Sequence, residues 1–142
     1  MKLIKYILIA VSIFTLSVTS FAGSLPQSKS PTGASVYIIS PANGETVPET
    51  FTVKFGLSGM GVAPAGVKKE NTGHHHLLIN AKALPKAGQP MGNDVKHFGG
   101  GQTETTLTLP KGKHTLQLIL GDHLHIPHNP PVVSEKITVF VK

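Results

Sequence analysis

The sequence contains no cysteine, no tryptophan and no arginine. Without cysteine, the chain has no disulfide framework, no thiolate metal site and no attachment point for a bacterial lipoprotein's lipid, so burial of apolar side chains must supply its stability. Without arginine, it lacks the forked guanidinium groups that bind phosphates and base edges. Its lysines are scattered singly, apart from the pair Lys68 and Lys69. We therefore expect no nucleic-acid partner and interpret the lysines as a solvated surface.

The N-terminal segment has the three regions of a signal peptide. Lys2 and Lys5 give a basic start, residues 6–14 form an apolar run, and Ser20 and Ala22 are the small side chains that the peptidase requires. The run is shorter than the roughly 20 residues that span a bilayer, which favours cleavage over retention as an anchor. Removing Lys2 and Lys5 lowers the formal charge from +6 to +4. We expect a periplasmic or secreted protein with no stable membrane insertion after cleavage.

The rest of the 142-residue chain has room for one domain. After the predicted signal peptide (residues 1–22), residues 23–34 are rich in serine, proline and glycine and have no apolar period, which predicts a flexible lead-in. Residues 35–142 contain short apolar runs between turn residues and no stretch of helical period. This pattern predicts an all-β domain, an immunoglobulin-like antiparallel β-sandwich of about seven strands.

Alternation of apolar and polar side chains locates the expected strands. Residues 51–58 alternate clearly and should bury one face. Residues 105–109 and 116–120 also alternate and flank a Pro-Lys-Gly-Lys turn, so we predict a hairpin. The segment Asn80–Lys96 has no clear pattern, and we expect it to supply one strand. The remaining strands are expected at residues 36–39, 74–79 and 133–141.

Histidine is unusually abundant, with eight histidines against six phenylalanines. If the Asn80–Lys96 segment runs back along the sandwich as a strand, the turn before His74, loop 97–102 and loop 122–131 all emerge at one end. His114 then lies at the opposite end. If that segment forms no strand, this convergence is not expected. The histidines expected at the common end are His74, His75, His76, His97, His123, His125 and His128.

Such a cluster is suited to a metal ion, because neutral imidazole binds copper, zinc and nickel, with copper strongest on affinity alone. Alternation along a strand points His74 and His76 to one face and His75 to the opposite, core-facing side, where we expect a hydrogen-bonded histidine. We predict a copper or zinc site. Its candidate ligands are His74, His76, His97, His125 and His128.

Four further residues are candidates for supporting roles. His75 and Met60 are possible additional ligands, and the Met60 thioether would favour the cuprous state. A partly buried filler is the stronger interpretation of Met60. Glu104 and Asp122 lie near the expected histidine end and could orient imidazoles by hydrogen bonds, or be ordinary surface acids.

Several long motifs resemble the exported family catalogued as domain of unknown function 4399. They are GMGVAPAG at residues 59–66, TGHHHLLI at 72–79, HFGGGQTE at 97–104, and HTLQL at 114–118 continuing through Gly121 and Asp122 to HIPH at 125–128. The resemblance extends from about Ser58 onward and implies a small secreted sandwich without an established activity. In the family pattern, an acid often stands where this chain has Asn80. The motif histidines match His74, His75, His76, His97, His114, His125 and His128, whereas His123 lies outside them.

The sequence contains no nucleophile elbow, Walker loop or H-E-x-x-H helix, so catalysis has little support. Our leading hypothesis is a non-enzymatic periplasmic metal-binding protein, copper-handling in particular, with no protein partner identified. One alternative is a cell-envelope interaction module that binds a protein or polysaccharide through the same loops. Another is a small copper redox enzyme similar to copper-zinc superoxide dismutase in its His-x-His strand, although the disulfide and the aspartate-bearing zinc loop are missing.

Overall fold

The structure is a computed structural model that describes residues 25–142, and the predicted signal peptide lies outside this range. The described residues form nine strands and no helix, so none of them forms a helix able to cross a membrane. The strands are β1 (Ser35–Ser40), β2 (Thr46–Val47), β3 (Thr50–Ser58), β4 (Gly61–Val62), β5 (Thr72–Ile79), β6 (Lys96–His97), β7 (Glu104–Thr108), β8 (Gly112–Gly121) and β9 (Ile137–Val141).

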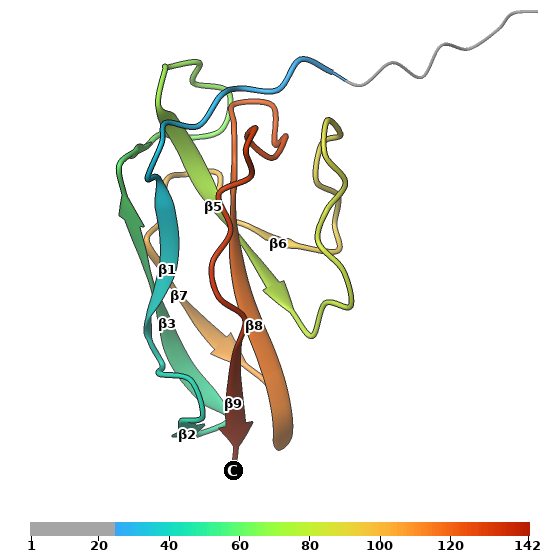
Figure 1. Cartoon of the computed structure of the whole chain (residues 1–142). Coiled ribbons are helices and arrows are strands. Elements are labelled where there is room, and N and C mark those ends of the chain that lie inside the picture. Colours follow the sequence, from blue (N-terminus) through green and yellow to red (C-terminus); the bar gives the residue numbers. More distant parts are fainter. Residues whose placement is uncertain (1–24) are drawn as a thin grey trace, which may run out of the picture.

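The strands form two sheets packed against each other (Figure 1). The smaller sheet has the order β1-β3-β7, and the larger has the order β2-β9-β8-β5-β4, with β6 also paired to β5. The pairs β2-β9 and β4-β5 are parallel and the others are antiparallel. The predicted all-β sandwich is confirmed, with three two-residue strands besides six longer ones, whereas the immunoglobulin-like type stays a prediction.

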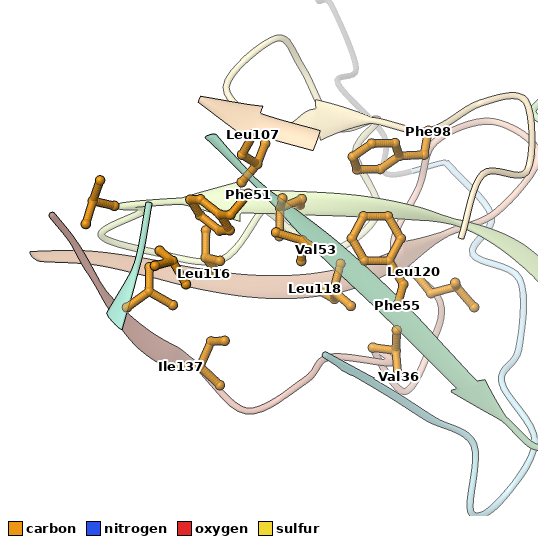
Figure 2. Packing of buried hydrophobic residues seen from close by; sticks show 14 of the residues in the cluster. Val36, Phe51, Val53, Phe55, Phe98, Leu107, Leu116, Leu118, Leu120 and Ile137 are labelled. Carbon is orange, nitrogen blue, oxygen red and sulfur yellow. The ribbon is translucent and has the colours of Figure 1, made fainter. Parts of the chain in front are cut away.

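A single apolar core fills the space between the sheets (Figure 2). The alternation expected along β3 is present, because Val53 and Phe55 are buried while Thr52 and Lys54 are exposed. Leu118 and Leu120 of β8 enter the same core from the larger sheet, as do Leu116 of β8 and Ile137, Val139 and Val141 of β9. The rings of Phe55 and Phe98 meet with their centroids 4.8 Å apart. Burial of these side chains holds the two sheets together.

The predicted hairpin of residues 105–109 and 116–120 is wrong. β7 pairs with β3, whereas β8 pairs with β5 and β9, so the connecting turn carries the chain from one sheet to the other. Leu107 and Leu116 face the same core from opposite sheets, and alternation alone does not distinguish this arrangement from a hairpin. His114 stabilises this connection by two hydrogen bonds. Its Nε2 donates to the Pro110 carbonyl at 2.8 Å, and its Nδ1 accepts from the side-chain amide of Asn80 at 2.9 Å.

The strand expected within Asn80–Lys96 is also absent, except that Lys96 begins the short strand β6. Residues 80–95 form an irregular excursion that projects from the side of the larger sheet (Figure 1). The excursion turns back, and β6 then pairs antiparallel with β5, with His97 opposite His76. A loop therefore returns the chain to β5, and the convergence of the histidines does not depend on a strand within residues 80–95.

Residues 25–31, which we call the N-terminal strap, lie along loop 122–131. Ser28 Oγ donates to Asp122 Oδ2 at 2.7 Å, and Gln27 Nε2 donates to the Pro127 carbonyl at 3.0 Å. The Asn129 amide donates to the Ser28 carbonyl at 2.9 Å. The flexible lead-in that the sequence predicts over residues 23–34 stays a prediction, and residues 27–30 of it are hydrogen-bonded to the loop that carries His125.

Replacing Leu118 with alanine should lower the free energy of unfolding by about 2–5 kcal/mol, because the side chain is 0% exposed and its removal leaves a cavity between the sheets. Ile39→Ala is the matched control, since Ile39 is 58% exposed and its truncation should change stability by about 0.5 kcal/mol or less. Urea denaturation measures both. Equal losses in the two variants would contradict the core described here.

Candidate metal centre

Four imidazoles converge on the outer face of the larger sheet. His74 and His76 project from the same side of β5, His97 lies in β6 opposite His76, and His125 comes from the loop after β8. Each ring offers one nitrogen, and these four atoms all lie within 4.8 Å of one another. His74 and His76 are completely buried, His125 is half-buried and His97 is exposed. The accessible side of the cluster is therefore the one that carries His97 and His125.

The spacing of the nitrogens fits a metal ion. His74 Nε2 lies 3.2 Å from His125 Nδ1 and 3.2 Å from His97 Nε2. Four imidazoles bound tetrahedrally at about 2.0–2.1 Å place their nitrogens about 3.3 Å apart. Two edges of the cluster thus already have the length of a tetrahedral site.

Hydrogen bonds between the rings do not account for this arrangement. A nitrogen of neutral imidazole carries either a hydrogen or a lone pair. His74 Nε2 faces two other ring nitrogens at the same distance, so it can form at most one well-directed hydrogen bond with them. A cation at the centre would instead accept a lone pair from every ring. The geometry therefore matches coordination better than a hydrogen-bonded network.

Asp122 shapes the loop that presents His125. Its Oδ1 accepts from the Leu124 amide at 2.9 Å and from the Ile126 amide at 3.1 Å, and its carbonyl accepts from the His125 amide at 2.9 Å. His125 itself has a φ of 63°, in the left-handed region that costs a non-glycine residue about 1–3 kcal/mol. Asp122 thus fixes a strained backbone turn and positions His125 through it, with no hydrogen bond to an imidazole of the cluster.

Burial keeps His74 and His76 uncharged near neutral pH. Burial, together with the charges that neighbouring histidines would carry, lowers the pKa of His74 to about 4 and that of His76 to about 3. Burial and the nearby His125 also lower the pKa of His97. Neutral imidazole is the form that binds a metal, so protons compete weakly at His74 and His76. The Nδ1 atoms of these two rings are buried without a hydrogen-bond partner.

Four of the five predicted ligands come together, and His128 does not join them. The ring nitrogens of His128 face the carbonyls of Leu120 at 3.4 Å and Thr72 at 3.1 Å. A bridge between Gly121 and Pro127 brings the chain back against β8, which directs the His128 ring beneath β5 rather than toward the cluster. Sequence spacing gives no sign of this reversal.

The other candidates also lie away from the cluster. His75 faces the core, with its ring centroid 5.2 Å from that of Phe55, and neither of its ring nitrogens has the hydrogen bond that we expected. Burial lowers its pKa. Met60 packs against the main core, in agreement with its interpretation as a filler residue. Glu104 is exposed in the smaller sheet, opposite Lys54.

Two residues that the sequence did not single out complete the site. Met91, from the excursion, lines a hollow of about 250 Å³ together with His76, His97 and His125. Gly121 of β8 lies directly beneath, where a Cβ atom would stand 2.6 Å from His76 Cε1 and 2.7 Å from Met91 Cε. Glycine at this position therefore leaves the space into which both side chains extend.

Acidification from neutral pH toward pH 4 should destabilise the metal-free protein. In the unfolded chain these histidines protonate near pH 6.5, whereas folded His74 and His76 protonate only near pH 4 and pH 3. The unfolded state therefore binds protons first as the pH falls. The contribution of these histidines to stability is fully present above about pH 6.5 and is lost progressively below it. Thermal denaturation of chelator-treated protein across this range measures the effect. His76→Leu should show a shallower decline, and an unchanged decline would contradict the assignment.

Gly121→Ala should weaken zinc binding about tenfold or more, because the added methyl group displaces the His76 ring from the cluster. Gly61→Ala is the matched control, since a Cβ there meets nothing closer than Thr72 Cγ2 at 3.5 Å. Competition against a chromophoric chelator gives both affinities. Gly121→Ala with wild-type affinity would show that the space beneath His76 is not needed.

Comparison with known proteins gives one result. No curated protein and no solved structure matches this chain. The profile of one family matches residues 53–142, which is more than half of the chain and includes all four clustered histidines. The matched region also contains Met91 and Gly121. The protein thus belongs to the family described as domain of unknown function DUF4399, in agreement with the resemblance of its motifs.

Proposed function

We propose that this protein binds one transition-metal ion, copper in the first place, through His74, His76, His97 and His125, and that it does so as a non-enzymatic protein of the periplasm or cell exterior. The observation that carries the proposal is the position of His74 Nε2, 3.2 Å from a nitrogen of His125 and 3.2 Å from a nitrogen of His97. These distances match the edges of a tetrahedral metal site.

The ligand chemistry supports copper, with zinc as the alternative. All four donors are imidazole nitrogens, which suit both metals and disfavour magnesium or calcium, since these prefer oxygen ligands. Among divalent ions of the first transition row, copper binds such a site most tightly on affinity alone. The chain offers no thiolate that would favour another metal.

The number and burial of the ligands support binding rather than catalysis. Catalytic zinc sites generally have three protein ligands and keep one position open for water or substrate, whereas four protein ligands close a tetrahedral site. Here four histidines are available, and two of them are completely buried. The partly open side at His97 and His125 provides a route by which an ion enters and leaves.

The proposed location rests on the N-terminal sequence. Residues 1–22 have the basic, apolar and small-residue regions of a signal peptide. A small exported domain without disulfides depends on its core and on bound ligands for stability. A metal ion that joins β5, β6 and loop 122–131 would add such stability.

Metal analysis of the untagged protein tests the proposal. Wild-type protein loaded with copper and then desalted should retain one equivalent, and the double variant His76→Ala plus His125→Ala should retain almost none. His123→Ala is the matched control, because His123 lies in the same loop but outside the cluster. Equal copper content in the double variant and the wild type would remove the proposal.

A further inference from the structure

A methionine lies beside the histidine cluster. Met91 lines the same hollow as His76, His97 and His125. A Cβ atom added at Gly121 would stand 2.7 Å from the terminal methyl carbon of Met91 and 2.6 Å from His76 Cε1, so both groups lie over this glycine. The end of the thioether side chain is therefore next to a ring of the cluster, at the wall of the same hollow.

The backbone holds Met91 in this place. Its amide donates to the carbonyl of His125 at 2.9 Å, so Met91 and one of the clustered histidines are joined directly. Its side chain also packs against a small apolar cluster of Leu78, Val95 and Ile119 on the outer face of the larger sheet. These contacts hold Met91, which belongs to the otherwise irregular excursion, beside the histidine cluster.

Met60 provides a comparison within the same chain. Met60 and Met91 are the only methionines after Met1. Met60 is half-buried against the main core, as a filler residue would be, and lines no part of the hollow at the histidine cluster. Only Met91 therefore combines apolar packing with proximity to the imidazoles.

We propose that the Met91 thioether is a soft ligand that takes the place of one imidazole of the four-coordinate site when the copper is in the cuprous state, and so enables the site to hold Cu(I). This inference rests on the proposed function. Imidazole binds both copper oxidation states and zinc, whereas thioether sulfur selects Cu(I). The site would then retain copper under reducing as well as oxidising conditions. Retention under reducing conditions would depend on Met91, whereas zinc binding would not.

The test compares three proteins: wild type, Met91→Leu and Met60→Leu. Leucine conserves the volume of methionine and removes the sulfur, so the fold should tolerate both substitutions. Cu(I) affinity is measured anaerobically against bathocuproine disulfonate, and Zn(II) affinity against a chromophoric chelator. We expect Met91→Leu to weaken Cu(I) binding about tenfold or more, with Zn(II) binding changed less than about twofold. Met60→Leu should match the wild type for both metals.

X-ray absorption at the copper edge gives an independent measurement. Because the sequence has no cysteine, a sulfur neighbour of Cu(I) can come only from methionine. Wild type and Met60→Leu should show sulfur at bonding distance, and Met91→Leu should not.

Three results would overturn the inference. The first is wild-type Cu(I) affinity in Met91→Leu, and the second is a copper spectrum of the wild type without sulfur. The third is a wild-type protein that binds Zn(II) or Cu(II) but not Cu(I), which would leave the metal-binding function standing. Failure of the wild type to bind any of these ions would overturn both proposals.

Discussion

The arrangement of this protein depends on the close approach of neutral imidazoles whose nitrogens face one another. Nitrogens of His97 and His125 each lie 3.2 Å from the same nitrogen of His74, too many partners for one ring atom to satisfy by hydrogen bonding. Burial disfavours protonation as a way of relieving this contact, because the pKa of His74 is lowered to about 4. A central cation, as proposed, would resolve the conflict, and the surrounding structure is the support that holds these rings together.

The support combines a rigid strand with two irregular segments. β5 lies between β8 and the short strands β4 and β6, and its alternation turns His74 and His76 outward while His75 and Leu77 enter the core. The β8 partner of His74 is Gly121, whose missing side chain leaves room above the sheet. The short strand β6, which follows the excursion, and loop 122–131 then contribute the other two imidazoles of the cluster, His97 and His125. The central strand β5 positions His74 and His76, and the segments around it bring His97 and His125 close to these two rings.

Much of this could be predicted from the sequence, and the failures have physical causes. Period-two alternation identified β3 and the opposite directions of His74 and His75, because a strand imposes that alternation whatever its neighbours are. Alternation does not reveal which sheet a strand joins, so the β7-β8 crossing was missed. His128 was misplaced because the backbone reverses at His125 and returns to β8 at Pro127. Met91 was missed because residues 80–95 have no periodicity that shows which side chains face inward.

The N-terminal strap has a consequence for when the site can form. Ser28 is hydrogen-bonded to Asp122, 94 positions later in the sequence, and Asp122 shapes the turn that presents His125. A polypeptide threaded through an export channel from its N-terminus delivers the first of these partners early and the second near the end. If the chain is exported unfolded, as the proposed location implies, the proposed ion would be acquired at the destination and not carried across in a folded protein.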